Sequence, residues 1–584
     1  MWMPVTARSS GLSTDGDLRG RSKPIRVTNL SIVPVRRRKP TGAIPAVVCL
    51  AVLCWPCVVT AQDEHSHEGD LGHVGTVHFP VSCAPELQAE FDRAVAILHS
   101  FFYEESERRL RSIAARDPHC AMVWWGVAMS LWHPLWDPPD SSSLARGWDA
   151  IRRADSLRAG SERERAYIAA LASFYRDANQ LDHRTRAAAY ERAMQQLHER
   201  FPADTEAAVF YALALNATLD YGDKTLAHQR RAGAILEPIY ALEPDHPGVA
   251  HYLIHSYEFP ALAPRALPVA RHYAEIAPHV PHALHMPSHI FTRLGLWDES
   301  IRSNLASAEA GREYAATHYA GAVYYDAVHA WDYLEYAYLQ KGQLSLARAI
   351  RDSVAGIRRV SHQTGSFFYA LSSVPARFAL ERHAWNEAVE LTVPAGWNWT
   401  RFPWSEATIH YARGLGAARI GRSEVARAAM ARLGAIRDTI TNPNFRNWIP
   451  QVEAQRRTVS AWLLLSERRA DEALSEMRAA ADLEDSTEKR PVTPGAVLPA
   501  RELLGDMLLQ THHPSDALGA YEAALRDAPG RWNSLEGAFR AATACGRSSE
   551  AMHYAQALIA LAKDGDPDRP GLAEARRALE GKPR

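Results

Sequence analysis

Residues 244–301 decide the fold, because one pattern occurs there twice in succession. They read PDHPGVAHYLIHSYEFPALAPRALPVARHYAEIAPHVPHALHMPSHIFTRLGLWDESI. Pro244 and Pro278 stand 34 residues apart, and a run of helical character follows each of them. A proline cannot continue a helix, so each marks the end of one unit and the start of the next. The stretch therefore predicts tandem helical repeats.

The period and the residue pattern resemble the tetratricopeptide repeat, a unit of helix, turn and helix closed by a proline. Tyr257 and Phe291 stand at the aromatic position of the first helix. Gly295 and Trp297 fit the turn, and Ser300 fits the small residue that opens the second helix. The resemblance implies that neighbouring repeats stack into a solenoid with a concave groove.

The same helical period continues from Glu86 to the end of the chain, and no stretch alternates as a strand would. Repeats of this kind are recognisable over residues 91–118, 190–218, 327–354 and 500–529. We therefore expect an all-α fold, a right-handed α-solenoid of helix-turn-helix repeats. The segments DPHCAMVWWGVAMSLWHPLW and HALHMPSHIFTRLGLW also resemble a group of exported bacterial repeat proteins, and this resemblance implies no known activity.

Changes in composition predict the domain boundaries. The linker is expected at 484–497, which is polar and contains two prolines. The five expected segments are an N-terminal extension with a signal peptide (1–61), a flexible His-rich segment (62–85), the main solenoid (86–483), the linker (484–497), and terminal repeats with a capping helix (498–584).

The N-terminal region predicts export to the periplasm or the cell exterior. A basic cluster at residues 36–39 precedes an apolar run that ends in Val59-Thr60-Ala61, a sequence suited to cleavage before Gln62. A membrane anchor is the alternative, but two prolines interrupt the apolar run and no basic stop-transfer cluster follows it. The full chain has 66 Lys and Arg against 67 Asp and Glu, which gives no indication of a nucleic-acid partner.

Cys83 and Cys120 flank the first helical hairpin. In an oxidising compartment a disulfide between them is expected, and two free buried thiols are the alternative.

Histidines recur in phase with the repeat. In this type of repeat, positions 2, 5 and 9 of the first helix usually face the groove. His251 and His255 take positions 5 and 9 of one repeat, and His282, His285 and His289 take positions 2, 5 and 9 of the next. In the repeat after that, position 2 is a histidine and position 5 an aspartate. The predicted site comprises His251, His255, His285, His289, His329 and Asp332.

Imidazoles from neighbouring helices suit a borderline metal such as zinc, copper or iron. Because the ligands must be neutral, metal affinity should fade below about pH 6.5, the pKa of free histidine. The alternative is a set of histidines that only pack and hydrogen-bond. A zinc peptidase is disfavoured, because neither His251 nor His285 is followed by the glutamate that would act as general base.

Two functions therefore remain open. The first is an exported scaffold that binds a peptide, a protein or a small ligand in its concave groove, without catalysis. The second is a metal-binding protein or a metal-dependent oxidoreductase built on the histidines. Metal content of the mature protein separates the two.

Overall fold

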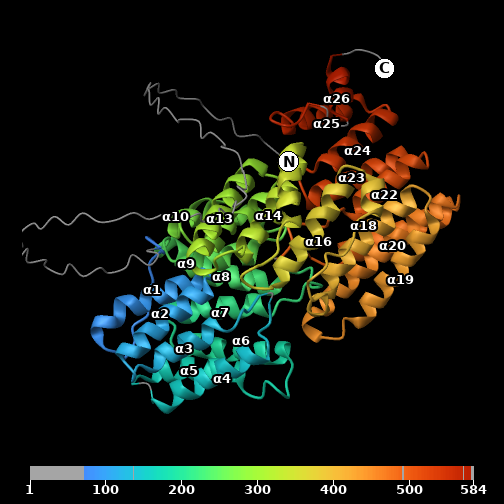
Figure 1. Cartoon of the computed structure of the whole chain (residues 1–584). Helices are drawn as coiled ribbons and strands as arrows, with labels where there is room; N and C mark the ends of the chain where they lie inside the picture. Colours follow the sequence, from blue (N-terminus) through green and yellow to red (C-terminus); the bar gives the residue numbers. More distant parts are fainter. Residues whose placement is uncertain are drawn as a thin grey trace, which may run out of the picture. The chain divides into compact units, whose positions relative to one another are not determined.

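A computed structural model describes residues 71–580 apart from 136, 159, 489–491, 568 and 570, and leaves out the side chains of 443 and 444. The expected signal peptide and the cleavage site before Gln62 lie outside the described residues. The described residues all belong to one compact unit. The described residues contain helices and turns, and only an isolated bridge between Val323 and Val360 in place of a strand. The chain is an all-α solenoid, as the sequence predicts (Figure 1).

The first part of the unit runs from a short 3-10 helix to the long helix α13. Its elements are η1 (Pro85–Leu87), α1 (Gln88–His99), α2 (Tyr103–Arg116), α3 (Ala121–Ser130), α4 (Ser141–Ser156), α5 (Glu162–Tyr175), α6 (His183–Arg200), α7 (Thr205–Ala217), α8 (Ala227–Leu242), α9 (Pro247–Tyr257), α10 (Ala263–Ile276), α11 (Pro281–His285), α12 (Pro287–Arg293) and α13 (Trp297–His318).

The second part continues the same up-and-down order. Its elements are α14 (Tyr325–Gln340), α15 (Leu344–Ala355), α16 (Gly365–Leu380), α17 (Trp385–Val389), η2 (Trp399–Arg401), α18 (Pro403–Arg419), α19 (Ser423–Thr439), η3 (Pro443–Trp448), α20 (Ile449–Ser466), α21 (Ala470–Asp485), α22 (Ala500–Gln510), α23 (Pro514–Asp527), α24 (Trp532–Ala544), α25 (Ser548–Leu561) and α26 (Leu572–Leu579).

The two helices of a repeat differ in burial. Every residue of α9 is buried, whereas in α15 only Ala347 and Val354 are. The first helix α9 is therefore enclosed on all sides, and the second helix α15 turns one apolar stripe inward. The turns lie where the sequence places them: Gly295 and Gly342 both adopt positive φ, at 70° and 72°, which favours glycine.

The helix that carries His285 and His289 is broken, although a continuous one was expected. Pro287 cannot donate a backbone hydrogen bond, so the segment divides into α11 and α12. The rings of His285 and His289 nevertheless remain neighbours, with centroids 4.9 Å apart.

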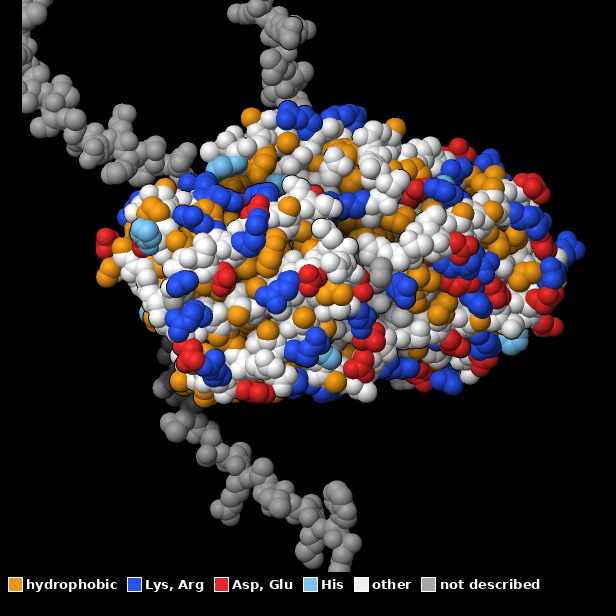
Figure 2. Space-filling view, turned by 90° about the horizontal axis from the view of Figure 1, so that it is seen from below, with side chains coloured by type: hydrophobic (Ala, Val, Ile, Leu, Met, Phe, Trp, Pro, Cys, Tyr) orange, Lys and Arg blue, Asp and Glu red, His pale blue; other side chains and the backbone are white. Residues whose placement is uncertain are grey.

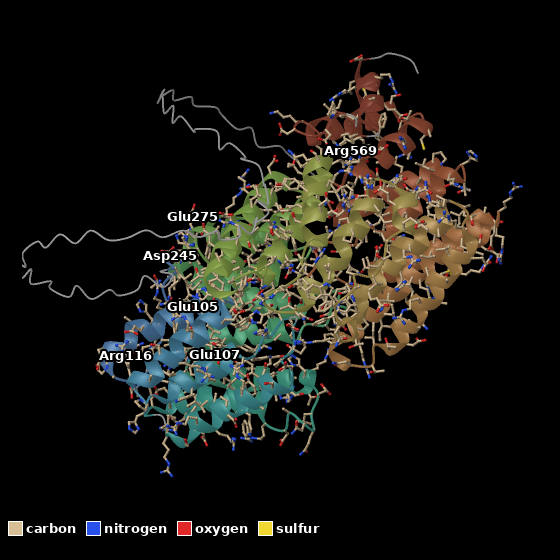
Figure 3. All side chains as sticks on the ribbon, in the orientation of Figure 1. Glu105, Glu107, Arg116, Asp245, Glu275 and Arg569 are labelled. Atoms are coloured by element: carbon tan, nitrogen blue, oxygen red, sulfur yellow. A yellow bond between two sulfur atoms is a disulfide. The ribbon has the colours of Figure 1, made fainter. Side chains whose placement is uncertain are left out.

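Residues 71–84 form an extended strap, not the flexible segment expected over 62–85. Leu71, Val74, Val77 and Phe79 are buried, and the intervening residues are partly or fully exposed. The strap is anchored at the turn before α9, where the Thr76 backbone N–H donates to the Asp245 carbonyl (3.0 Å; Asp245 is labelled in Figure 3). Its four buried apolar side chains thus join the core of the helices.

The apolar core consists of two large clusters. One extends from Leu71 to Tyr324 and the other from Val328 to Ala575. The segment 484–497, expected to be a linker, lies within the second: Val492 and Val497 are buried there. The change of core therefore falls near the start of α14.

Cys83 and Cys120 form a disulfide, as expected, and the bridge fastens the strap to the start of α3. Cys545 is the free cysteine among the described residues. None of the described helices has the length and apolarity that crossing a membrane requires. On the face seen in Figure 2 acidic and basic side chains are mixed, without the basic stripe typical of a nucleic-acid interface.

Candidate metal centre

Five of the six predicted site residues meet in one buried cluster. His251 and His255 project from α9, His285 ends α11, His289 lies on α12, and His329 lies on α14. None of these side chains is more than 5% exposed. His282 of α11 joins them, with its ring centroid 5.1 Å from that of His251. We call this set the six-histidine cluster: His251, His255, His282, His285, His289 and His329.

The cluster divides into two groups of three. One ring nitrogen from each of His251, His255 and His282 lies within 4.8 Å of the other two, and this is the first trio. His285, His289 and His329 satisfy the same condition and form the second trio. The trios adjoin, because the His255 and His289 ring centroids are 5.7 Å apart. Each trio offers the number of imidazoles that holds a catalytic zinc in some enzymes.

The Glu258 carboxylate links the two trios by hydrogen bonds to one histidine of each. One carboxylate oxygen accepts from Nδ1 of His255 and the other from Nδ1 of His289, both at 2.8 Å. A carboxylate behind a histidine fixes the ring orientation and keeps the proton on Nδ1, so that Nε2 presents a lone pair. Glu258 therefore prepares one ligand of each trio.

Two further rings are held in the same way. The Nδ1 of His251 lies 2.7 Å from the His99 carbonyl, and the Nδ1 of His285 lies 2.6 Å from the Asn304 side-chain oxygen. The Asn304 amide nitrogen donates to the Ser300 carbonyl at 2.8 Å, which orients the oxygen toward His285. Both acceptors require the proton on Nδ1, and both leave the lone pair on Nε2.

The second trio shows the consequence of these tautomers. The Nε2 atoms of His285 and His289 lie 2.9 Å apart. With both protons on Nδ1, two lone pairs face each other across that distance. Such a contact is repulsive unless a cation or a proton lies between the nitrogens. The first trio has a related feature: Nε2 of His251 is buried and has no hydrogen-bond partner among the described residues.

Burial keeps two histidines of the first trio neutral. It lowers the pKa of His251 well below its usual value, and it lowers that of His282 to about 3. The Asp326 carboxyl lies 3.7 Å from Nδ1 of His282, and burial raises its pKa to about 8. At neutral pH these two imidazoles are therefore uncharged, as metal ligands must be.

Asp332 does not belong to the cluster. Although it lies on α14 with His329, its carboxylate forms an ion pair with Arg377 of α16 at 2.7 Å and accepts from Ser373 at 2.7 Å. Arg377 also pairs with Glu335 at 2.9 Å. A fully buried arginine requires carboxylate partners, and Asp332 neutralises the charge of Arg377.

The histidines do not line an open groove, as their repeat positions suggested. Phe101, between α1 and α2, covers the first trio, with its ring centroid 4.3 Å from that of His251 and 5.6 Å from that of His282. On the other side the Tyr333 ring stacks on His289 at 5.1 Å. Sequence reasoning could not place Phe101, which lies 150 residues before His251. His282 carried the repeat phase and could have been included.

His99, Glu206 and His246 form a second group of histidines around a carboxylate. Its ring nitrogens already form hydrogen bonds with other protein groups. Nδ1 of His246 accepts from the Val249 backbone, so its Nε2 carries the proton that is donated to Glu206 at 2.9 Å. His99 bonds both Glu206 and the Tyr252 hydroxyl. This group is structural.

Comparisons with known proteins identify no family. No family model matches the chain, and no curated protein matches it. Solved structures with similar helical arrangements include a human IFIT1 dimer with m7Gppp-AAAA (11% identity, TM-score 0.32, covering 79% of this chain and 90% of that one) and the APC/C hetero-tetramer Cut9-Hcn1 (12%, 0.30, 84% and 90%). The P58(IPK) TPR domain is also similar (14%, 0.20, 65% and 99%). These TM-scores are low, so the assignment to the helical-repeat class rests on this chain's own helices.

Proposed function

We propose that this protein is an exported metalloprotein whose solenoid holds two transition-metal ions, one in each histidine trio. The observation that carries the proposal is the approach of the His285 and His289 Nε2 atoms to 2.9 Å, with both rings held by acceptors at Nδ1. An ion bound at about 2.0–2.1 Å from each nitrogen would turn this repulsive contact into a pair of bonds. The ion is zinc, copper or iron, the metals that suit imidazole.

The ligand number favours a reactive centre over a structural one. Three protein ligands leave a fourth position for water or a substrate, whereas structural zinc sites are closed by four. Copper or iron in such positions can exchange electrons, and zinc cannot. The identity of the bound ion therefore decides between a metal-dependent oxidoreductase and a protein without redox chemistry.

Reconstitution with zinc, copper and iron tests the proposal, with metal measured by mass spectrometry after desalting. The wild type should retain two ions per chain. His251→Ala and His289→Ala should each lower that number, while circular dichroism shows unchanged helix content because contacts in a solenoid are local. His553→Ala, at an exposed position on α25, is the matched control and should retain both ions. If the wild type retains none of the three metals, a proton shared by His285 and His289 explains their contact and the cluster is structural.

A second candidate function is the binding of a ligand by the solenoid itself. The sequence predicts such a ligand in the concave groove. The supporting observation is a cavity of about 430 Å³ whose lining comes mostly from helices of the second part and includes none of the six histidines. A protein or peptide partner stays a prediction. Pull-down of the purified protein against a peptide library, with an unrelated helical-repeat protein as control, would test it.

A further inference from the structure

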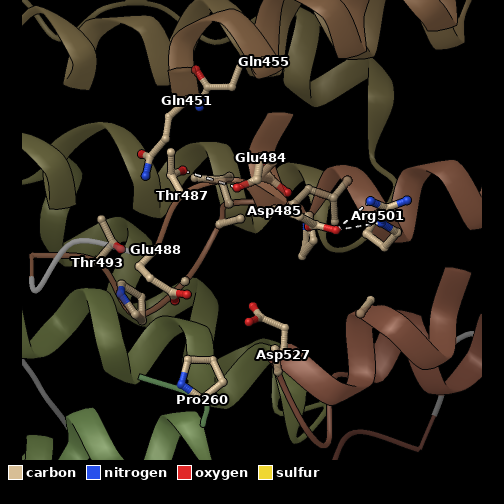
Figure 4. A pocket seen from close by; sticks show the side chains of 18 of the residues that line it. Pro260, Gln451, Gln455, Glu484, Asp485, Thr487, Glu488, Thr493, Arg501 and Asp527 are labelled. Atoms are coloured by element: carbon tan, nitrogen blue, oxygen red, sulfur yellow. Dashed lines mark hydrogen bonds and ion pairs between the residues drawn. The ribbon is translucent and has the colours of Figure 1, made fainter. Parts of the chain in front are cut away.

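The cavity lies where several first helices of the second part face the segment 493–499 (Figure 4). Its walls come from α12, α14, α16, α18 and α20, with the ends of α21 and α23 at the other side. The volume of about 430 Å³ is that of a site for a small organic molecule. None of the six histidines lines it.

Four carboxylates surround this space, and three of them have cationic partners. Asp485 pairs with Arg501 at 2.7 Å, Glu488 pairs with Lys224, and Asp527 lies 3.9 Å from Arg293. The fourth, Glu484, forms no ion pair with any described residue. One of its oxygens accepts from the Ala500 backbone N–H at 2.7 Å, which fixes the side chain.

Among the described residues, Glu484 therefore has no cationic partner. Burial raises its pKa to about 8, with Asp485 and Asp527 adding to the rise and Arg531 opposing it. Gln455 also lacks a partner, because its side-chain oxygen is buried and accepts no hydrogen bond from the described residues. Both groups line the cavity.

The remaining walls are aromatic. Trp404 stacks on Trp448 with centroids 5.2 Å apart and planes at 8°, and Tyr411 is held by its hydroxyl, which donates to the Leu498 carbonyl at 3.3 Å. Tyr336 and Tyr369 complete this side. Rigid aromatic faces attract cations and pack well against apolar groups.

We propose that the cavity binds a small organic amine, with its ammonium group against the Glu484 carboxylate and its apolar body against Trp404, Tyr369 and Tyr411. A neutral alcohol would form no charge-assisted hydrogen bond with Glu484. A charge-assisted hydrogen bond between ammonium and carboxylate is the strong interaction that this arrangement allows.

Isothermal titration calorimetry with phenethylamine tests the proposal, and 2-phenylethanol serves as the uncharged isostere. The amine should bind with a Kd of about 1 mM or tighter, and the alcohol about tenfold more weakly or worse. Glu484→Gln keeps the shape and the bond to Ala500 but should weaken amine binding about tenfold or more. Glu275→Gln, at an exposed position on α10 labelled in Figure 3, should leave it unchanged.

Proton release provides a second readout. Since the pKa of Glu484 is about 8, this group is about nine-tenths protonated at pH 7, and amine binding should release up to one proton per ligand. Titrations in buffers of different ionisation enthalpy measure this release, which Glu484→Gln should abolish. The proposal is overturned if the wild type binds no amine, if the alcohol binds equally well, or if Glu484→Gln binds as the wild type does. The test does not depend on metal, so its failure would leave the metal centre untouched.

Discussion

Glu258 is the residue on which both trios depend. Its two oxygens hold His255 and His289 by Nδ1, so a single side chain sets the tautomer of one ligand in each trio. It follows His255 by three residues, which places it within reach at the end of α9. The sequence shows this spacing but not that Glu258 also reaches a histidine of the next repeat.

Glu258→Gln should lower metal affinity 10- to 100-fold, the usual effect of losing a carboxylate behind a ligating histidine. The amide is neutral and no longer enforces a proton on both Nδ1 atoms. Competition with a chromophoric chelator measures the affinity. Glu237→Gln, on the exposed side of α8, is the control and should bind metal as the wild type does. Equal affinities for Glu258→Gln and the wild type would contradict a role for Glu258 in preparing the ligands.

A second residue-scale prediction concerns acid stability at His183, far from the metal centre. Burial and, to a smaller extent, Arg186 lower the pKa of His183 to about 3, whereas in the unfolded chain it is about 6.5. The unfolded state therefore takes up the proton first, and stability falls as pH drops below about 6.5. At pH 5 this residue should cost up to about 2 kcal/mol relative to pH 7.

His183→Phe should remove that contribution. Urea unfolding of the two proteins at pH 7 and pH 5 measures it, because the other buried histidines are common to both. The variant should lose less stability between pH 7 and pH 5 than the wild type does. An equal loss would show that His183 is not held neutral in the folded protein.

At the scale of elements, the strap 71–84 joins parts of the core that are distant in sequence. The Phe79 ring contacts Phe91, Trp125 and Tyr167, with centroids 5.8, 5.3 and 4.9 Å away. The strap thus fills the space between α1, α3 and α5, and the disulfide at Cys83 fixes its end.

Phe79→Ala should lower the free energy of unfolding by about 3–5 kcal/mol, since it empties a fully buried aromatic position. His78→Ala, at an exposed neighbouring position, should change it by less than about 0.5 kcal/mol. Chemical denaturation measures both. A loss below about 1 kcal/mol for Phe79→Ala would mean that the strap is not part of the folded core in solution.

The contrast between the strap and the repeats shows what the sequence can predict. Repeat period, closing prolines and turn glycines are local signals, and the helices follow them. The strap has no helical period, and its burial depends on contacts with helices far along the chain. The break at Pro287 was visible in the sequence, but the repeat pattern around it favoured a continuous helix.

For the candidate site too, the local signals were predictable from the sequence and the contacts between distant segments were not. Phase along the repeat placed all six histidines on one face of their helices, because it is set by helix geometry, and five of them were included in the predicted site. Their burial was not predictable, since it depends on Phe101 and Tyr333, which reach the cluster from other repeats. Asp332 shared the phase but pairs with Arg377, a residue of the next repeat.

At the scale of the whole molecule, the six-histidine cluster and the cavity share walls. The Arg293 side chain lines the cavity and donates from Nε to the Glu258 carbonyl at 3.0 Å. The Tyr333 hydroxyl donates to the carbonyl of Thr493, another lining residue, at 3.1 Å, while its ring stacks on His289. The centre lies near the change from the first core to the second, with α9, α11 and α12 on one side and α14 on the other.

Anomalous X-ray diffraction from crystals of the metal-loaded protein tests the central claim most directly. Data collected above and below the absorption edge of the bound metal locate each ion without assumptions about the site. We predict two peaks, one about 2.0–2.1 Å from a ring nitrogen of each of His251, His255 and His282, and one equally close to His285, His289 and His329. A fully loaded crystal with no peak in either trio would contradict the account.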